Sequence, residues 1–312
     1  MIDWTALRVR LLGERNTSVL PSTVRLPALP QAVTDFVRKS QDPEASPAQL
    51  GRIIESDAGL TTNLLKLINS AAFALRMKVS TPQQAISLLG VKKCRLFLLT
   101  TSAQQAMSGI RSTLINPRSF WAVNLERGLF AQEVAGLLKA DSDLAYAAGI
   151  LQDLVLPVLT GELTEEYTGF LNAQGSRNEN LNRQERSRFG WDHCDASGQL
   201  MLGWEFPDDL ICCIQLHHRG LALLGDQELQ RTAATAVAIS ALLPDPLQQV
   251  PDGVRKLALL GQSWKTFDLM ELAERVDTKM LEFSSSPSGH IPLSRRCSAL
   301  LKRAEAVAAP AS

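Results

Sequence analysis

The sequence has few of the features that mark secreted or membrane-spanning proteins. Its five cysteines include no C-x-x-C pair, so neither a disulfide framework nor a zinc knuckle is indicated. No apolar run approaches the roughly 20 residues needed to cross a bilayer, and the first residues lack the basic-then-apolar layout of a secretory signal. We therefore expect a globular cytoplasmic protein with reduced core cysteines and no membrane contact.

The motifs of common nucleotide and acyl-transfer enzymes are also missing. The chain has no glycine-rich phosphate loop, no G-x-G-x-x-G after a strand and no G-x-S-x-G elbow. Cys194 follows His193 directly, but adjacency in sequence does not aim both side chains at one substrate. Of the four histidines, His290 lies in a serine-rich stretch with linker composition and is expected to be exposed. His193, His217 and His218 are left as the candidates for chemistry.

Acidic residues are absent from a long part of the first half. Residues 1–120 hold 15 basic and 7 acidic residues, and residues 58–125 hold no acidic residue at all. These bases have two interpretations. In the first they lie on solvated helix faces and pair with acids of the second half. In the second they form a surface that attracts a nucleotide, a nucleic acid or an acidic protein. Base-stacking aromatics are scarce there, which disfavours nucleic acid. The candidate interaction surface consists of Lys66, Arg76, Lys78, Lys92, Lys93 and Arg95.

The spacing of apolar residues predicts an all-α protein. With 312 residues, 45% of them hydrophobic, the chain can bury one large core or two moderate ones. Apolar residues recur with helical spacing and short breaks, without convincing strand alternation. Helix starts are expected at Pro30, Ser46, Asp57 and Thr81, and Gly90 is expected to end a helix.

Several short motifs follow one another in the chain. They are Leu26-Pro27-Ala28-Leu29-Pro30, Asp57-Ala58-Gly59-Leu60, Asn69-Ser70-Ala71, Val79-Ser80, Ala85 to Gly90, Phe120-Trp121, Ala148 to Leu154, Phe189 to His193, Gly203 to Pro207 and His217-His218. Their order resembles the HDOD domain, the HD-related output domain of bacterial signalling proteins. The resemblance covers roughly residues 20–225 and implies an all-helical bundle related to HD-type metal phosphohydrolases, usually a non-catalytic regulatory or scaffolding module.

The resemblance implies a metal site that has lost ligands. HD hydrolases hold divalent ions with histidines and carboxylates, and the ion activates water. Valine and glutamine stand where the first two family histidines would be, and the final aspartate has no clear counterpart within residues 235–240. We therefore expect no catalytic residue, no cofactor and no bound metal. The vestigial cleft would comprise Val123, Asn124, Gln152, Asp153, His193, His217 and His218.

Three interpretations of the surviving residues stay open. His217 shares a helical face with Leu210 and is expected to point inward, hydrogen-bonded to Asp153 or a backbone carbonyl. Alternatively, Asp153, His193 and His217 form a three-ligand zinc site of a phosphohydrolase or phosphodiesterase. A sensor for a nucleotide or another small anion is the third possibility. His218 would shape the pocket or reach the surface.

The expected organisation has four parts. Residues 1–19 form an N-terminal helix, and residues 20–225 form the HDOD domain, with a basic subdomain over 20–115 and a degenerate HD-like subdomain over 116–225. Within it, residues 163–182 are expected to be a loop with a little helix. Helices in 226–283 complete the bundle, and 284–312 hold a linker and a C-terminal helix that folds back or binds a partner. The expected partner is a signalling protein.

Overall fold

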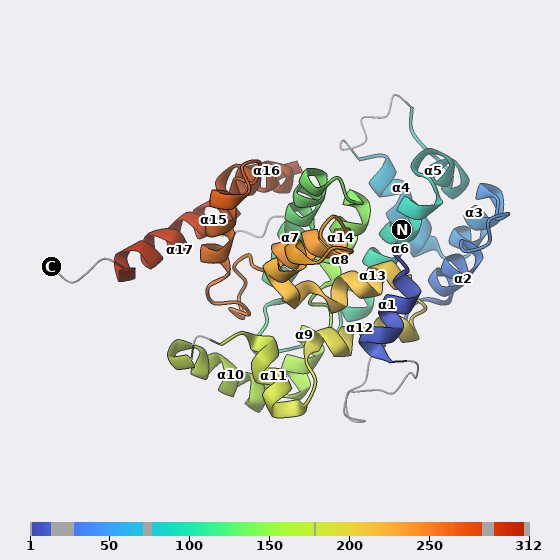
Figure 1. Cartoon of the computed structure of the whole chain (residues 1–312). Coiled ribbons are helices and arrows are strands. Elements are labelled where there is room, and N and C mark those ends of the chain that lie inside the picture. Colours follow the sequence, from blue (N-terminus) through green and yellow to red (C-terminus); the bar gives the residue numbers. More distant parts are fainter. Residues whose placement is uncertain (1, 14–27, 71–76, 178, 283–289, 309–312) are drawn as a thin grey trace. The chain divides into compact units, whose positions relative to one another are not determined.

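The structure is a computed structural model, shown in Figure 1. It describes all residues except 1, 14–27, 71–76, 178, 283–289 and 309–312. The described residues form helices joined by turns and loops, and no strand occurs among them. The prediction of an all-α protein is therefore confirmed.

The helices follow one another with short connections. Their bounds are α1 Trp4–Leu12, α2 Gln31–Lys39, α3 Pro47–Glu55, α4 Ala58–Ile68, α5 Pro82–Leu89, α6 Val91–Met107, α7 Pro117–Leu138, α8 Ser142–Leu151, α9 Leu156–Glu162, α10 Thr164–Arg177, α11 Leu181–Phe189, α12 His193–Gly203, α13 Asp208–Gln215, the 3₁₀ helix η2 His217–Gly225, α14 Ala233–Ser240, α15 Gly253–Ser263, α16 Leu269–Glu282 and α17 Leu293–Ala308.

Side-chain caps place the helix starts where the sequence predicts them. Ser46 accepts a hydrogen bond from Gln49 N while the Gln49 side chain accepts from Ser46 N, which is a capping box. The Asp57 side chain accepts from Leu60 N and the Thr81 side chain accepts from Gln84 N, which caps the starts of α4 and α5. Gly90, at φ 81°, separates α5 from α6 because a left-handed residue ends the first helix.

The chain divides into two compact units, one formed by residues 25–109 and 200–207, the other by residues 1–24, 110–199 and 208–312. The smaller unit packs α2 to α6 around buried Phe36, Leu50 and Leu64. Within it, the Asn69 amide donates to Val79 O at 2.7 Å and accepts from Val79 N at 2.8 Å. This clamp holds the end of α4 to the chain that leads into α5.

Two glycines let α7 and α8 of the larger unit cross closely. A Cβ added at Gly149 would lie 2.7 Å from the Cα of Gly128 and 3.0 Å from the carbonyl oxygen of Arg127. Helix α14, in which every side chain is buried, packs on both helices. This close packing brings the middle of α7 next to the end of α8, where the site residues lie.

The structure corrects the prediction for residues 163–182. They form α10 and the start of α11 rather than a loop with a little helix. Tyr167 explains the ordering, because its ring is 1% exposed and stacks edge-on against Phe170, 5.4 Å away between centroids.

The C-terminal helix α17 packs on α15 and α16, and Leu293 and Cys297 are fully buried. The prediction that His290 is exposed is wrong. Its Nε2 lies 2.8 Å from Glu126 Oε1 on α7, and its side chain is 15% exposed. The reason is the buried Glu126 carboxylate, which pairs with both His290 and Arg296 and so draws the chain onto the core.

One stretch of the described residues, Ser142–Glu162, is long and apolar enough to cross a membrane by length and composition alone. The prediction that no apolar run approaches membrane-spanning length is therefore wrong for this stretch. It runs through α8 and α9, and 89% of its apolar window is buried inside the protein. Such burial is typical of a core helix.

Candidate functional site

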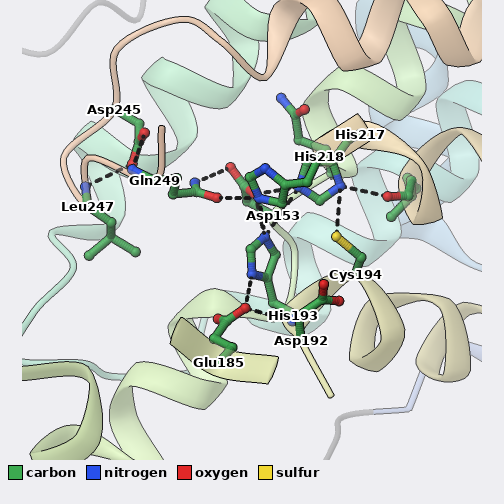
Figure 2. Close-up of polar contacts among 12 residues, drawn as sticks. Asp153, Glu185, Asp192, His193, Cys194, His217, His218, Asp245, Leu247 and Gln249 are labelled. Carbon is green, nitrogen blue, oxygen red and sulfur yellow. Dashed lines mark hydrogen bonds and ion pairs between the residues drawn. The ribbon is translucent and has the colours of Figure 1, made fainter. Parts of the chain in front are cut away.

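Four side chains from three separate segments converge in the larger unit (Figure 2). Asp153 lies in the turn between α8 and α9, His193 begins α12, and His217 and His218 begin η2. His193 and His217 are fully buried, Asp153 is 1% exposed, and His218 is partly buried. The structure thus brings together four of the seven residues predicted for the cleft.

A buried carboxylate orients His193. Glu185 on α11 accepts from the backbone N of His193 at 3.0 Å and lies 2.6 Å from its Nδ1. The Tyr167 hydroxyl donates to the other oxygen of Glu185 at 2.7 Å. Asp192 caps α12 through Asp195 N. Because Nδ1 of His193 faces a carboxylate, it carries the proton, and Nε2 points toward the other histidines.

A backbone carbonyl orients His217. Helix α13 ends at Gln215, so His217 does not continue the face of Leu210 as expected, but its side chain still points inward. Its Nδ1 lies 2.6 Å from Ile214 O, and its Nε2 lies 3.4 Å from Asp153 Oδ1. The expected hydrogen bond to a backbone carbonyl is therefore present. His218 Nε2 lies 2.9 Å from His193 Nε2 and 3.2 Å from Gln249 Oε1.

The guanidinium of Arg127 occupies the opposite side of Asp153. Arg127 on α7 is 1% exposed and forms a short ion pair with Asp153 Oδ2. Its second terminal nitrogen lies 3.1 Å from Asp245 Oδ2 and 3.3 Å from Leu243 O. Gln249 Nε2 also donates to Asp153 Oδ2, at 2.8 Å. Oδ2 is thus fully engaged, whereas Oδ1 has no hydrogen-bond partner.

The ionisation of these groups follows from burial and neighbouring charge. Burial raises the pKa of Asp153, but Arg127, His217 and His193 outweigh it and hold the pKa far below the usual range. Burial lowers the pKa of His193, yet Glu185 and Asp153 more than reverse this and raise it to about 9. Burial and the two neighbouring histidines lower the pKa of His218 well below its ordinary value. Asp153 and His193 therefore favour their charged forms, and His218 favours its neutral form.

Val123, Asn124 and Gln152 lie apart from the histidines. Val123 and Asn124 line a cavity of about 280 Å³ together with Arg127, Asp153 and other residues of the larger unit. The amide nitrogen of Asn124 is buried and has no partner. Gln152 is fully buried, but its Nε2 donates to Gly149 O of its own helix. The two positions where the resemblance expects histidines thus supply no ligand atom to the centre.

The donor set fits one metal ion and not two. On the Oδ1 side of Asp153, the Nε2 atoms of His193 and His217 lie 3.6 Å and 3.4 Å from the oxygen, and His218 Nε2 lies 2.9 Å from His193 Nε2. On the Oδ2 side, Arg127 supplies a fixed positive charge where Val123 supplies no ligand. The ligand atoms of His193, Cys194, His217 and His218 lie within 4.8 Å of one another, so any ion bound here would be held by residues of this group, and it would supply Lewis-acid chemistry only if it kept an open position.

Sequence reasoning missed five residues of this site. They are Arg127, Tyr167, Glu185, Asp245 and Gln249. A signal existed for Arg127, because it follows Val123 by four residues and so falls on the same helix face. Asp245 and Gln249 lie in the loop between α14 and α15, beyond the segment 235–240 that was searched for an aspartate, and no periodicity marks them.

The predicted basic surface belongs to the smaller unit. Lys66 on α4, Lys78 before α5, and Lys92 and Lys93 on α6 are exposed, whereas Arg95 is partly buried. Arg76 lies outside the described residues. Helices α4, α5 and α6 pack on one another, so these bases belong to one compact group of helices.

Comparison with known families identifies the fold. The profile of the HDOD domain matches residues 26–220. The chain belongs to the HDOD family. An uncharacterised protein of Treponema pallidum (strain Nichols) is 25% identical over 225 residues, which are 67% of this chain and 43% of that protein. The chain thus spans less than half the length of this curated relative.

Solved structures show the same fold. An HDOD domain protein of unknown function from Geobacter sulfurreducens is 18% identical, with TM-score 0.56, 97% of this chain covered and 96% of that one. A structure from Shewanella amazonensis SB2B, named provisionally as a phosphohydrolase, is 20% identical, with TM-score 0.62 and coverage of 84% and 95%. One from Marinobacter aquaeolei VT8, named provisionally as a signal transduction protein, is 18% identical, with TM-score 0.56 and coverage of 97% and 64%.

Proposed function

We propose that this HDOD protein is a non-catalytic regulatory module of cytoplasmic signal transduction, which acts through contacts with a partner protein. The observation that carries the proposal is the Arg127 guanidinium on Asp153. A hydrolytic metal site needs an ion with an open position for water next to the substrate. Here Arg127 and Gln249 take one oxygen of Asp153, and buried histidines surround the other.

Assays of phosphoester hydrolysis test the absence of turnover. The full chain is incubated with bis-p-nitrophenyl phosphate and with cyclic dinucleotides, in the presence of Mn²⁺, Mg²⁺ or Zn²⁺. We expect rates equal to the buffer blank for the wild type and for Asp153→Asn. Turnover by the wild type that Asp153→Asn abolishes would contradict the proposal and establish the phosphohydrolase alternative, because a contaminating enzyme would not respond to that substitution.

The exposed lysines of the smaller unit are the proposed contact surface. Residues 58–125 include basic residues and no acidic residue, so this part of the chain is basic as a whole and favours a partner with an acidic face. Opposite charges of this kind mainly accelerate association, and their effect falls as salt rises. We therefore expect partner capture that weakens between low and high ionic strength.

A charge-reversal pair tests this surface. Lys92→Glu/Lys93→Glu changes two exposed residues of α6, and Arg255→Glu/Lys265→Glu makes the same charge change in the larger unit. Proteins retained from a host extract by the wild type and by the control, but lost from the α6 variant, support the proposal. Equal retention by all three correctly folded proteins would remove the basic surface from it.

A specific observation favours a second candidate, a sensor of a small anion. The cavity beside Asp153 contains two buried donors without partners, Asn124 Nδ2 and Arg127 Nε. Unpaired buried donors are costly and favour an acceptor-rich ligand. Calorimetric titration with phosphate, nucleotides and cyclic dinucleotides tests this. Saturable binding that Asn124→Leu removes would establish the sensor, and no heat with any of them would eliminate it.

A further inference from the structure

We infer that a second cavity of the larger unit, at the C-terminal end of α7, binds a small aromatic anion, that is, a planar ring that carries a carboxylate or a phosphate. The cavity has a volume of about 410 Å³, which lies within the range of ligand pockets in proteins. Its lining comes from α7, η2, the turn before α14 and the end of α15. It has no lining residue in common with the cavity beside Asp153, and the inference goes beyond the proposed function.

Apolar side chains form one part of the lining. They are Leu137 and Leu138 in the last turn of α7, Leu224 in η2, and Trp264 at the end of α15. All four are partly exposed, so they offer apolar area that a ligand can cover. The Trp264 ring stacks on the buried ring of Phe267, with 5.5 Å between centroids and an interplanar angle of 24°. An indole that is held in this way is a ready platform for another aromatic ring.

Two cations form the other part of the lining. Lys139 and Arg231 are exposed, and neither forms an ion pair with another residue of the described chain. Gln230 adds an amide, and none of the lining residues is acidic. A guanidinium binds a carboxylate or a phosphate through two parallel hydrogen bonds, and an ammonium adds a point charge. This side of the cavity therefore favours an anionic group.

The backbone of Lys139 adopts a conformation that lysine disfavours. Lys139 follows the last residue of α7 at φ 56° and ψ 36°, in the left-handed region. Ala140 N donates to Ala135 O at 2.9 Å, as in a Schellman motif. Glycine is the usual residue at the left-handed position, because a Cβ makes this conformation unfavourable. A strained residue beside a cavity points to a use for its side chain.

Arg231 also stands against the local electrostatics. It lies two residues before Ala233, the first residue of α14, and the N-terminus of a helix carries partial positive charge. The Thr232 hydroxyl donates to Leu229 O and does not cap the helix. A cation beside an uncapped N-terminus is unfavourable, and an anion bound to Arg231 would offset both charges.

The two parts of the lining together select the ligand. A neutral ring would leave the two cations without a counter-charge, and a bare anion would leave the leucines and the indole in contact with water. A molecule that has both a ring and an anionic group satisfies the whole lining. The volume lies at the lower end of the range for ligand pockets, so it suits one or two fused rings with a short acidic group rather than a dinucleotide.

Calorimetric titration of the full chain with matched probes tests the site. Indole-3-acetate and 1-naphthyl phosphate combine a ring with an anion, whereas indole, acetate and inorganic phosphate each have only one of the two features. We expect the combined probes to bind with a Kd of about 1 mM or tighter, which about 13–15 non-hydrogen atoms supply at the efficiency of drug-sized ligands. The other probes should bind at least about 10-fold more weakly. The tighter of the two combined probes identifies the anionic group.

Fluorine NMR of protein that contains 5-fluorotryptophan locates the bound probe. The chain has five tryptophans, and the resonance that Trp264→Leu removes belongs to Trp264. This resonance should shift during the titration more than the other four do. A shift at other tryptophans without one at Trp264 would place the probe elsewhere and overturn the inference.

Lys139→Gly separates a binding role from a structural one. Glycine removes the side chain and suits the left-handed conformation, so the melting temperature should stay equal or rise while binding weakens at least about 10-fold. Lys139→Gln/Arg231→Gln should weaken binding further. Lys302→Gln/Arg303→Gln is the matched control, because it removes the same two charges from exposed positions of α17 and should bind as the wild type does.

Three calorimetric results would overturn the inference. The first is folded wild-type protein that shows no saturable binding of either combined probe at about 10 mM. The second is undiminished binding by Lys139→Gln/Arg231→Gln. The third is equal binding of the combined probes and of indole, acetate or phosphate, because the lining would then not read a ring and an anion together.

Discussion

The largest single effect on stability that we expect is that of removing Arg127. Arg127→Met keeps most of the side-chain volume but leaves Asp153 and Asp245 without their shared cation, and Leu243 O without a donor. Breaking a buried ion pair by removing one partner costs about 3–5 kcal/mol. Because two carboxylates lose their partner here, we expect the upper part of that range, out of a total stability of about 5–15 kcal/mol.

Urea and thermal unfolding followed by tryptophan fluorescence measure this loss. A loss of about 4 kcal/mol corresponds to a melting temperature lower by roughly 8–16 °C for a unit of this size. Arg275→Met is the control, because its guanidinium is 53% exposed and its ion pairs with Glu133 and Glu271 should contribute no more than about 1 kcal/mol.

A double substitution separates lost charge balance from lost packing. Arg127→Met/Asp245→Asn removes one of the two orphaned carboxylates, while the new amide oxygen still accepts from Gln249 N. If uncompensated charge causes the loss, the double variant should be more stable than Arg127→Met. An Arg127→Met protein within about 1 kcal/mol of the wild type, like the control, would refute the view that this guanidinium neutralises the site.

Three further predictions concern packing, pH and the thiols. Gly149→Ala should lower the free energy of unfolding by more than about 2 kcal/mol, because the new Cβ meets the backbone of α7. Gly136→Ala is the control, since a Cβ there has nothing within 4 Å, and it should be neutral or raise the free energy of unfolding by up to about 1 kcal/mol. Chemical denaturation of both variants measures the difference. Partial burial opposes ionisation of Glu133, but Lys279 and Arg275 outweigh it and hold the pKa of Glu133 below 4.5. The contribution of the ionised Glu133 to stability is therefore complete above pH 4.5 and is lost as the pH falls through the pKa of the folded state. Glu133→Gln should therefore lower the melting temperature at pH 7, and by progressively less as the pH falls below 4.5; a difference that does not shrink on acidification would contradict the ion pair. All five cysteines are buried, so a thiol reagent should modify them only after unfolding, and fast reaction of the native protein would show that the core opens.

The helical fold and most of the aspartate–histidine cluster are readable from the sequence, because caps, apolar spacing and short motifs are local patterns. Caps such as Ser46 and Asp57, and apolar residues repeated at helical spacing, determine where helices start and which faces they bury. The motif order also placed Asp153, His193 and His217 at one site before any coordinate was known. It failed for residues 163–182, where a polar composition concealed helices fixed by the burial of Tyr167.

The sequence by itself determined the fold family, and it shows a valine and a glutamine at the two positions where the resemblance expects histidines. Only the tertiary structure decided what replaced them. Arg127 meets Asp153 because glycines let α7 and α8 approach closely, and Gln249 reaches the same carboxylate from a loop almost a hundred residues later. Whether two buried groups oppose or neutralise each other depends on distances of a few ångströms, which packing sets and no sequence spacing records.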